Sequence, residues 1–354
     1  MHRIPRALLP LIYLPTLGFE AVLRLRNALY NSGILRQRLL RNPTISIGNI
    51  TTGGSGKTPL VVYTSKKILE LGFTPIILTR GYGRSSSESL VIAPGESLSS
   101  PAPRLGDEPA LIRRHVPEAW IGISKKRYAA GNRMDASDKK PVFILDDGFQ
   151  HRRLGRDLDI AVIDATQPLA CNRIVPMGTL REPVSGLHRC HAIVINGGAD
   201  QREIENLNLK SDRFHCEQYI ERLEPFESWI KSDASPSKRL LNRPAFLVAA
   251  VGNPLRFEDD IKKFGIRVTG TRFYRDHYRL KPGDWRQCIT RARDSGADAI
   301  VITEKDAVKL MQPPDFPVFV SVQNTRMDNE EAYLDLLRRC IDKTSKVEGP
   351  MSNV

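Results

Sequence analysis

The chain has few cysteines for its length, with five in 354 residues and none in a C-x-x-C pair. Their odd number and wide spacing do not fit a disulfide framework, and no zinc-binding pattern is present. We expect reduced thiols in the cytosol. The sequence also has no internal repeat, and with 41% hydrophobic residues it is long enough to bury a sizeable core. A chain of this length more often divides into two domains than it forms one.

The apolar run at the N-terminus is too short to cross a membrane as a helix. It covers residues 7–19 (ALLPLIYLPTLGF), where Pro10 and Pro15 interrupt it and Glu20 ends it. A spanning helix needs ~20 apolar residues. No small-x-small cleavage site follows the run, and this argues against a signal peptide. We therefore predict that residues 1–41 form a membrane-associated segment at the interface.

Residues 16–31 have the periodicity of an amphipathic helix. Apolar residues surround one narrow polar face, whose members recur at spacings of 4, 3 and 4 residues. This face comprises Glu20, Arg24, Asn27 and Asn31. Basic side chains flank the helix at Arg3, Arg6, Arg24, Arg26, Arg36, Arg38 and Arg41. Such a helix either contacts an anionic membrane surface or packs on the protein's own core, and the surrounding positive charge favours the membrane.

Acidic residues are outnumbered, with 40 Asp and Glu against 53 Lys and Arg, and the formal net charge is +13. This excess favours an anionic partner, which is a nucleic acid, an acidic membrane or a phosphorylated substrate. Charge alone does not choose among these three. However, the sequence has no basic patch interleaved with aromatic residues, so we do not predict binding of nucleic acid.

Beyond residue 41, short apolar runs rich in β-branched residues alternate with helical segments. We expect strands at residues 44–47, 75–79, 141–145, 160–163, 192–195, 245–251, 267–273, 299–303 and 318–322. This alternation predicts an α/β fold of the P-loop NTPase type, whose mostly parallel sheet has helices on both faces, with a second, smaller α/β domain. The predicted parts are the membrane-associated segment 1–41, a P-loop kinase domain 42–216, a linker 217–243, a C-terminal α/β domain 244–343 and a disordered tail 344–354.

The most informative motif is ISIGNITTGGSGKT, residues 45–58. A strand that runs into a glycine-rich turn, with Gly-Lys-Thr at the start of a helix, lets backbone N–H groups surround phosphate oxygens. In this reading Lys57 neutralises the β- and γ-phosphates of ATP, and the Thr58 hydroxyl ligates Mg²⁺. Thr51 stands where the usual spacing has glycine, so the entry to the loop must differ from the commonest form. The predicted ATP-binding residues are Thr51, Thr52, Gly53, Gly54, Ser55, Gly56, Lys57 and Thr58.

A second motif, VFILDDGFQHRR, occupies residues 142–153. Carboxylates that directly follow a buried parallel strand lie at the carboxyl edge of the sheet, where doubly wound folds bind ligands. Asp146 is therefore predicted to be a second Mg²⁺ ligand, and the alternative is a solvated Asp-Asp-Gly turn. Spacing alone gives no role to Asp147, Gln150 or His151, and His151 is as well suited to the surface as to substrate contact.

Three shorter motifs are ambiguous when taken alone. Asp107 in GDEP precedes an apolar helix, where it serves as a helix cap, as a catalytic base or as both. Residues 122–127 (GISKKR) either hold a phosphate or form a solvated basic run. The motif GTLREP places Arg181 and Glu182 together in a loop.

The combined motifs resemble those of the tetraacyldisaccharide 4'-kinases, which are the lipid A kinases. The resemblance rests on GNITTGGSGKTP, TRGYGR, GDEP, DDGFQHRR, GTLREP, the Asp276-His277 pair and TEKDAVKL, which occur in that order over roughly residues 8–322. The family's loop also lacks glycine at the position of Thr51. The resemblance implies phosphoryl transfer from ATP, with Mg²⁺, to the 4'-hydroxyl of a tetraacylated glucosamine disaccharide 1-phosphate. It further implies contact with inner-membrane lipids at the cytosolic face of the inner membrane of a Gram-negative bacterium.

The resemblance also implies roles for single residues. Asp107 would accept the proton of the sugar hydroxyl, and His277 from the second domain would orient or assist it. The acidic set around the metal and nucleotide would be Glu108, Asp146, Asp147 and Glu182, with Thr58, Glu108 and Asp146 as the metal ligands. Contacts with the γ-phosphate or the lipid headgroup would come from Arg127, Gln150, His151 and Arg181.

Other P-loop classes fit the sequence less well. A GTPase needs Asn-Lys-x-Asp to read its base, and the nearest run, TEKD, has Glu304 in place of the lysine. A nucleic-acid-dependent ATPase would use the positive charge, but the apolar N-terminus would hinder it. The remaining alternative is another membrane-associated P-loop ATPase, or a tethered protein that binds nucleotide without turnover. For the binding protein, a change at Asp107 would cause no catalytic loss.

Overall fold

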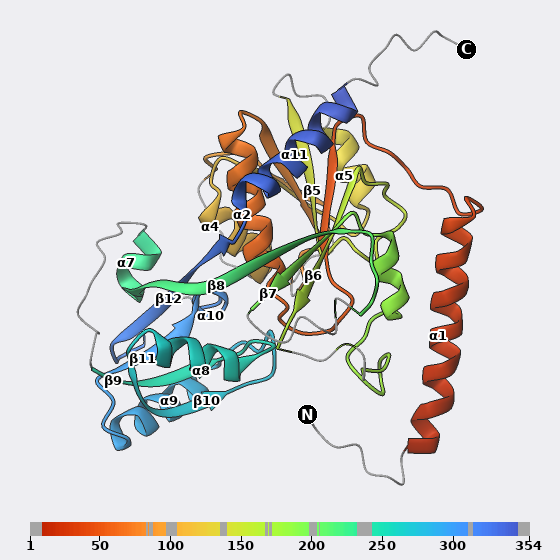
Figure 1. Ribbon diagram of the computed structural model, residues 1–354. Helices are drawn as coiled ribbons and strands as arrows, with labels where there is room; N and C mark the ends of the chain where they lie inside the picture. Colours follow the sequence, from red (N-terminus) through yellow and green to blue (C-terminus); the bar gives the residue numbers. More distant parts are fainter. Residues whose placement is uncertain are drawn as a thin grey trace. The chain divides into compact units, whose positions relative to one another are not determined.

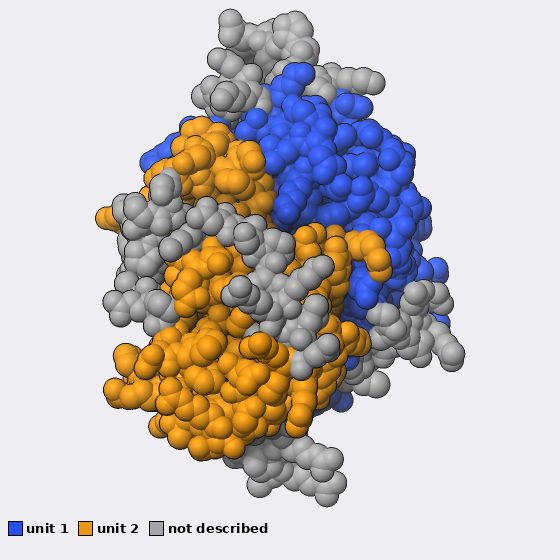
Figure 2. Space-filling model, turned by 90° about the vertical axis from the view of Figure 1, so that its left-hand side faces the viewer, with its two compact units in different colours: residues 1–79, 126–217, 327–354 blue, residues 80–125, 218–326 orange. Residues whose placement is uncertain are grey.

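The computed structural model describes most of the chain. The described residues are 9–82, 84, 88–96, 105–134, 140–166, 169, 172–197, 204, 206–231, 243–310 and 314–345. The chain forms two compact units, shown in blue and orange in Figure 2. Unit 1 contains residues 1–79, 126–217 and 327–354, and unit 2 contains residues 80–125 and 218–326.

Unit 1 is built on a parallel sheet in the order β8-β7-β6-β1-β5-β2. Its strands are β1 (Thr44–Gly48), β2 (Thr74–Thr79), β5 (Pro141–Asp146), β6 (Leu158–Asp164), β7 (Ala192–Asn196) and the first part of β8 (Asp212–Pro225). Every residue of β1, β5, β6 and β7 is buried. Continuous apolar runs form such strands because helices cover both faces of a parallel sheet.

Three helices of unit 1 belong to this layered arrangement (Figure 1): α2 (Lys57–Glu70), α5 (Arg127–Met134) and α11 (Glu330–Ser345). The fully buried Tyr333 of α11 lies with its hydroxyl oxygen 2.7 Å from that of Thr64 on α2. This buried polar contact joins the C-terminal helix to the helix that follows the phosphate loop.

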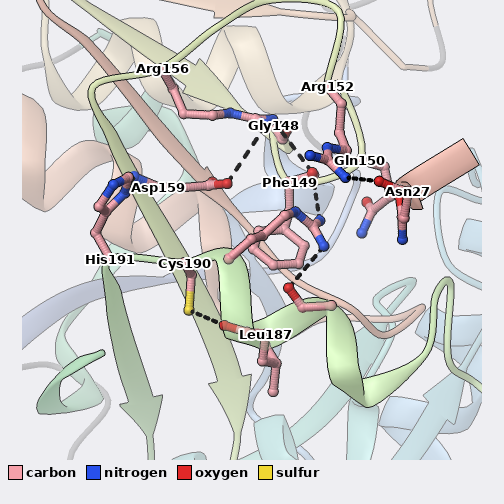
Figure 3. Close-up of polar contacts among 12 residues, drawn as sticks. Asn27, Gly148, Phe149, Gln150, Arg152, Arg156, Asp159, Leu187, Cys190 and His191 are labelled. Atoms are coloured by element: carbon pink, nitrogen blue, oxygen red, sulfur yellow. Dashed lines mark hydrogen bonds and ion pairs between the residues drawn. The ribbon is translucent and has the colours of Figure 1, made fainter. Parts of the chain in front are cut away.

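The N-terminal helix α1 (Leu9–Asn31) is longer than the predicted helix at residues 16–31. Only part of it packs on unit 1, where Leu23 enters the hydrophobic cluster formed with β6 and β7. Arg152 also holds the helix by donating to the Asn27 carbonyl (3.0 Å; Figure 3). It donates to the Asn31 side chain as well (2.8 Å). Large apolar side chains of α1 remain exposed, namely Tyr13, Leu14, Leu17, Phe19, Val22 and Leu25. Among the described residues, no helix is long and apolar enough to cross a membrane.

Unit 2 contains four parallel strands in the order β10-β9-β11-β12 and the antiparallel pair β3 and β4. The strands are β3 (Leu90–Ile92), β4 (Trp120–Ile123), β9 (Pro244–Ala249), β10 (Arg267–Phe273), β11 (Ala299–Thr303) and β12 (Val318–Met327), whose last residue falls in unit 1. Its helices are α4 (Asp107–His115), α7 (Phe226–Lys231), α8 (Pro254–Lys263), α9 (Pro282–Asp294) and the short α10 (Glu304–Ala307).

The strands of unit 2 alternate between two hydrophobic clusters. Phe246 of β9 packs in the cluster that contains Trp285 of α9, whereas the next residue, Leu247, packs in the cluster that contains Phe257 of α8. Successive side chains of a strand point to opposite faces. Helices α8 and α9 therefore cover opposite faces of these strands (Figure 1).

The α/β class and the mostly parallel strands predicted from sequence are confirmed. The structure differs in the predicted linker 217–243, because β8 continues to Pro225 and α7 follows it. Alternating buried residues along β8 show that this segment is a polar-faced strand, which an apolar-run search does not detect. The rest of that linker up to residue 242, and the predicted tail from residue 346, lie outside the described residues.

Candidate active site

The phosphate-binding loop of unit 1 connects β1 to α2. Strand β1 ends at Gly48, and α2 begins at Lys57, directly after Gly56 with φ 87°. Gly48 cannot be replaced by a larger residue without a shift of the backbone, because a Cβ there would lie 2.5 Å from the Phe149 nitrogen. The loop therefore delivers Lys57 and Thr58 to the N-terminus of α2, where backbone N–H groups favour an anion.

Asn49 organises this loop, and sequence reasoning did not assign it a role. Its side-chain oxygen accepts a hydrogen bond from Lys57 Nζ (3.1 Å). Its side-chain nitrogen donates to the hydroxyls of Thr51 (3.1 Å) and Ser55 (2.8 Å). The Thr51 side chain, which replaces the usual glycine, is thus a buried hydrogen-bond partner. The sequence shows this asparagine between a strand and a glycine-rich turn, but its burial and its hydrogen bonds are visible only in the structure.

The GTLREP segment pairs with the entry to the loop. Thr52 N donates to Thr179 O (2.6 Å), and Arg181 N donates to Ile50 O (2.7 Å). Thr51 and Leu180 form an antiparallel bridge between these two bonds. The motif therefore has a structural role in shaping the loop, and it also directs the Arg181 side chain into the site.

Asp146 lies at the carboxyl end of β5, where its Cα is in register with that of Ile47 on β1. Its side chain is buried, and its Oδ2 accepts a hydrogen bond from the Thr79 hydroxyl (2.9 Å). The register places this carboxylate beside the end of β1, where the phosphate loop begins. The Thr58 hydroxyl belongs to the first turn of α2, where that loop ends. Hydroxyl and carboxylate oxygens are donors of the kind that Mg²⁺ prefers, so the chemistry of these two side chains suits a magnesium ion. Among the described residues, no group of three or more His, Cys, Asp or Glu side chains forms a metal site.

Asp147 has a left-handed backbone conformation, with φ 49°, and its carboxylate faces two cations. Oδ1 lies 3.6 Å from Lys57 Nζ, and both oxygens accept from Arg181 Nη1 (2.8 and 2.9 Å). Burial would raise the pKa of Asp147, but Lys57 and Arg181, assisted by Arg127, bring it below its usual value. The carboxylate therefore stays ionised and fixes the position of the phosphate-loop lysine.

Three arginines hold the turn after Asp147 by its backbone carbonyls. Arg127 donates to Asp147 O (3.1 Å), Arg156 to Gly148 O (2.9 Å) and Arg189 to Phe149 O (2.9 Å). Figure 3 shows Arg156 between this turn and Asp159, with which it forms a buried ion pair (3.6 Å). Charge-assisted bonds to successive carbonyls restrain the strained backbone of the turn. Sequence reasoning missed Arg156 and Arg189, because neither lies at a spacing that indicates this contact.

Glu182 has no exposed surface, and both of its carboxylate oxygens have partners. Oε1 accepts from Gln150 (2.7 Å) and Arg189 (2.9 Å), and Oε2 accepts from Arg189 (2.7 Å) and Asn27 (3.3 Å). Gln150 Nε2 also donates to Asn49 O (2.7 Å). The structure therefore assigns to Glu182 and Gln150 the task of joining α1 to the phosphate loop. His151 is half-buried, and its backbone N–H donates to Gly148 O (2.8 Å).

In unit 2, Asp107 is the first residue of α4 and is almost fully buried. The residue that caps the helix is Gly106, and no side chain makes a capping hydrogen bond. Gly106 is required because its φ is 94° and a Cβ there would lie 2.7 Å from Tyr82 O. The capping alternative for Asp107 is therefore not the arrangement found. Glu108 follows in the same turn and is half-buried.

His277 meets Asp107 in unit 2, although 170 positions separate them. His277 Nδ1 lies 3.1 Å from Asp107 Oδ2, while Asp107 Oδ1 is buried without a hydrogen-bond partner among the described residues. His277 has a left-handed backbone, with φ 62°, and its ring lies 4.8 Å from the ring of Tyr82. A non-glycine residue in this conformation is held there by its surroundings, which is common at functional sites.

The TEKD segment contacts His277 and the end of α4. Glu304 accepts from Gln323 N (3.0 Å) and lies 2.8 Å from His115 Nε2, which joins α10 to the end of α4. Lys305 donates to Asp276 Oδ1 (2.9 Å) and lies 3.2 Å from His277 Nε2. Burial would raise the pKa of Asp276, but the Lys305 ammonium, assisted by His277, brings it below the usual range.

The predicted site residues thus form two groups. In unit 1 the structure brings together Lys57, Asp146, Asp147, Arg127, Gln150, Arg181 and Glu182 around the phosphate loop. In unit 2 it brings together Asp107 and His277. The first group can bind and orient a polyphosphate, and the second can accept a proton at a buried carboxylate oxygen.

Comparisons with known proteins agree with this chemistry. The family model for tetraacyldisaccharide-1-phosphate 4'-kinase (LpxK) matches residues 6–342. A tetraacyldisaccharide 4'-kinase from Chlorobaculum tepidum is 32% identical over 339 residues, covering 95% of each chain. One from Desulfotalea psychrophila is 33% identical over 298 residues, covering 82% of this chain and 85% of its own.

A solved structure is also similar along the chain. The crystal structure of LpxK from Aquifex aeolicus in complex with ATP has a TM-score of 0.72 and 29% identity to this chain. The similarity covers 95% of this chain and 98% of the solved one. With the family model matched from near one end to near the other, the chain belongs to the family of tetraacyldisaccharide-1-phosphate 4'-kinases and is a kinase.

Proposed function

We propose that this kinase transfers the γ-phosphate of ATP to the 4'-hydroxyl of a tetraacylated glucosamine disaccharide 1-phosphate in lipid A biosynthesis. The products are the 1,4'-bisphosphorylated lipid and ADP. Family membership over almost the whole chain supports the substrate and the nucleotide. The observation that carries the residue roles is the buried Asp107 carboxylate, with one oxygen beside His277 and the other without a partner among the described residues.

In the proposed reaction, the 4'-oxygen of the sugar forms a bond to the γ-phosphorus as the bond from that phosphorus to the β-γ bridging oxygen breaks. The electron pair of the broken bond stays on ADP. The hydroxyl proton passes to Asp107 Oδ1, and His277 holds Asp107 through Oδ2. A positioned base of this kind contributes roughly 10²–10⁴-fold to a rate. Because phosphoryl transfer needs little covalent help from the protein, alignment of the hydroxyl with the γ-phosphorus also contributes to the rate.

The phosphate loop and the cations around Asp147 bind the nucleotide in this proposal. Loop residues 51–58 surround the phosphates, and Lys57 meets the β- and γ-phosphates from the position that Asn49 and Asp147 give it. Arg181 is about a third exposed, which leaves it able to contact the γ-phosphate or the lipid headgroup. Arg127 acts through Asp147, Gln150 acts through Asn49, and His151 remains a candidate for headgroup contact.

Mg²⁺ is proposed as the metal cofactor, held by Thr58 and Asp146, with Glu108 as a further ligand by family resemblance. The oxygen donor set of Thr58 and Asp146 supports the assignment, since Mg²⁺ is usually held by one or two protein oxygens together with substrate phosphates. When bound, the ion would neutralise charge on the β- and γ-phosphates.

We also place the enzyme at the cytosolic face of the inner membrane of a Gram-negative bacterium, in contact with its lipids through α1. The exposed apolar side chains of α1, including Leu14 and Val22, support this location, as does the net charge of +13. The alternative, a helix packed on the protein's own core, accounts for Leu23 but not for its exposed neighbours.

The test is transfer of radiolabelled γ-phosphate from ATP to a tetraacyl disaccharide 1-phosphate in detergent. Wild type is compared with Lys57→Ala and Asp107→Asn. We expect labelled bisphosphorylated lipid from wild type and a loss of roughly 100-fold or more in each variant. The matched controls are Lys66→Ala, which lies on the same helix as Lys57, and Asp335→Asn, an exposed carboxylate of α11, and both should retain activity.

The outcomes separate the alternatives. If wild type hydrolyses ATP while the lipid stays unlabelled, the protein is a P-loop ATPase and the lipid substrate is wrong. If Asp107→Asn transfers phosphate at the wild-type rate, the lipid kinase assignment stands but Asp107 is not the base.

A further inference from the structure

Lys305 is the one cation that the structure records against the far side of the His277 ring, within the part of unit 2 that it describes. Its Nζ lies 3.2 Å from His277 Nε2, and 2.9 Å from Asp276 Oδ1. The opposite ring nitrogen, Nδ1, lies 3.1 Å from Asp107 Oδ2. The imidazole therefore lies between an ammonium group and the carboxylate of the proposed base.

These contacts determine which ring nitrogen carries the proton. A lysine ammonium has three donors and no acceptor, so a nitrogen at hydrogen-bond distance from it must accept. A neutral imidazole has one N–H, and with Nε2 accepting, that N–H is on Nδ1. Nδ1 then donates to Asp107 Oδ2. With its lone pair toward Lys305 Nζ at 3.2 Å, Nε2 cannot carry a proton in this arrangement.

Asp276 provides the competing arrangement. Its Oδ2 lies 3.8 Å from His277 Nε2, and without a cation it would attract an N–H on that nitrogen. Nδ1 would then face Asp107 with a lone pair, and the hydrogen bond to the base would be replaced by repulsion. Lys305 Nζ donates to Asp276 Oδ1 and also lies at hydrogen-bond distance from His277 Nε2. It therefore blocks the arrangement in which Nε2–H faces Asp276.

The fold holds Lys305 in place independently of the histidine. It lies on the four-residue helix α10, which begins after the Thr303 cap. Its neighbour Glu304 is buried and paired with His115 at the end of α4, the same helix that begins at Asp107. Asp306 accepts from the backbone N–H of Ala250 (3.0 Å). Lys305 on α10 and Asp107 on α4 face the two ring nitrogens of His277. The contact between Glu304 and His115 joins these two helices.

From this geometry we infer that Lys305 is a positioning residue that fixes His277 as the Nδ1–H tautomer, so that His277 donates to Asp107 Oδ2 and leaves Oδ1 for the sugar hydroxyl. The inference rests on the proposed role of Asp107 and His277. Lys305 contacts neither the nucleotide nor the acceptor in this scheme. It acts on the rate through the histidine.

The test combines kinetics with a direct readout of the tautomer in the full-length chain. The chain has seven histidines, so selective ¹⁵N-histidine labelling gives a small set of ring signals, and His277 is assigned by its loss in His277→Gln. The ring nitrogen shifts report which nitrogen carries the proton. The variants are Lys305→Met, which removes the charge at similar size, and Lys305→Arg, which keeps it. The control is Lys262→Met, which removes an exposed ion pair on α8.

We expect the Nδ1–H tautomer in wild type and a shift toward Nε2–H in Lys305→Met. The kcat for lipid phosphorylation should fall by roughly 10²-fold in Lys305→Met, with KM for ATP unchanged within about twofold, because only the base is affected. Lys305→Arg should keep the tautomer and recover most of the rate. Lys262→Met should match wild type in every readout.

Each result decides for or against the inference. An Nε2–H tautomer in wild type overturns it, even if no Lys305 variant folds. Unchanged kcat and tautomer in a folded Lys305→Met overturn it as well. If Asp107→Asn and His277→Gln lose activity while Lys305→Met does not, the proposed base stands and only the role of Lys305 fails. If Asp107→Asn and His277→Gln are fully active, the proposed base itself has failed.

Discussion

Lys57 Nζ donates a 3.1 Å hydrogen bond to the side-chain oxygen of Asn49, eight residues earlier in the same loop. The lysine at the end of the phosphate loop is thus oriented by a residue at the loop's entry. Asn49 also bonds the hydroxyls of Thr51 and Ser55, so a single buried side chain determines both the loop conformation and the lysine position.

We predict that Asn49→Ala lowers kcat/KM for ATP by roughly 10- to 100-fold. The estimate follows from losing a hydrogen bond to a charged group, worth about 1.5–3 kcal/mol. Steady-state kinetics with varied ATP check this value. Thr51→Gly restores the commonest spacing and removes only one of the three side-chain hydrogen bonds of Asn49, so its loss should be smaller. Equal losses in the two variants would show that Asn49 does not act through Lys57.

The buried pair of Arg189 and Glu182 gives a prediction for stability. Arg189→Met leaves the Glu182 carboxylate buried without its cation, which costs about 3–5 kcal/mol of unfolding free energy. Adding Glu182→Gln removes the unpaired charge and should recover a substantial part of that cost. Chemical unfolding of the two single variants and the double variant measures the coupling. Arg213→Met, at an exposed position, is the control. Strict additivity of the two changes would contradict the role of the ion pair.

The exposed apolar face of α1 predicts a change in membrane binding. A variant with Leu14→Gln, Val22→Gln and Leu25→Gln removes three exposed apolar side chains without touching Leu23 in the core. Each large apolar side chain contributes about 1.5–3 kcal/mol when it leaves water, so binding should weaken at least tenfold. Sedimentation with anionic vesicles measures the effect. Thermal stability should stay unchanged, and undiminished vesicle binding would exclude this face as the contact.

The described cysteines are predicted to react slowly with thiol reagents. Cys190, Cys216, Cys288 and Cys340 are buried, and Cys171 lies outside the described residues. Burial raises the pKa of Cys190 to about 11 and that of Cys340 to about 12. A raised pKa means less thiolate at neutral pH, so alkylation of both should be roughly 100-fold slower than that of a free thiol. Peptide mapping after timed alkylation, with and without urea, measures these rates, and rapid labelling of either cysteine in the native chain would contradict the burial.

Much of the first unit was accessible from sequence because its determinants are local. The strand ending at Gly48, the glycine-rich turn and the helix beginning at Lys57 are consecutive in the chain. Parallel strands place their carboxyl ends at one edge, and Asp146 lies at that edge in register with Ile47 of β1, while its role as a Mg²⁺ ligand stays a prediction. By contrast, β8 was missed because its buried residues alternate with exposed ones in a polar segment.

The sequence by itself determined the phosphate loop, the α/β class and the family, because each depends on residues that are close together or in a fixed order. The tertiary structure decided which side chains of the candidate site contact one another. Asp107 has a buried oxygen beside a histidine 170 positions away, and Glu182 joins α1 to Gln150 across 155 and 32 positions. Such contacts leave no periodic signal, since a side chain's hydrogen-bond partner depends on which elements pack together. Only the packed chain therefore shows Asn49 beside Lys57, Arg189 paired with Glu182, and Lys305 beside His277.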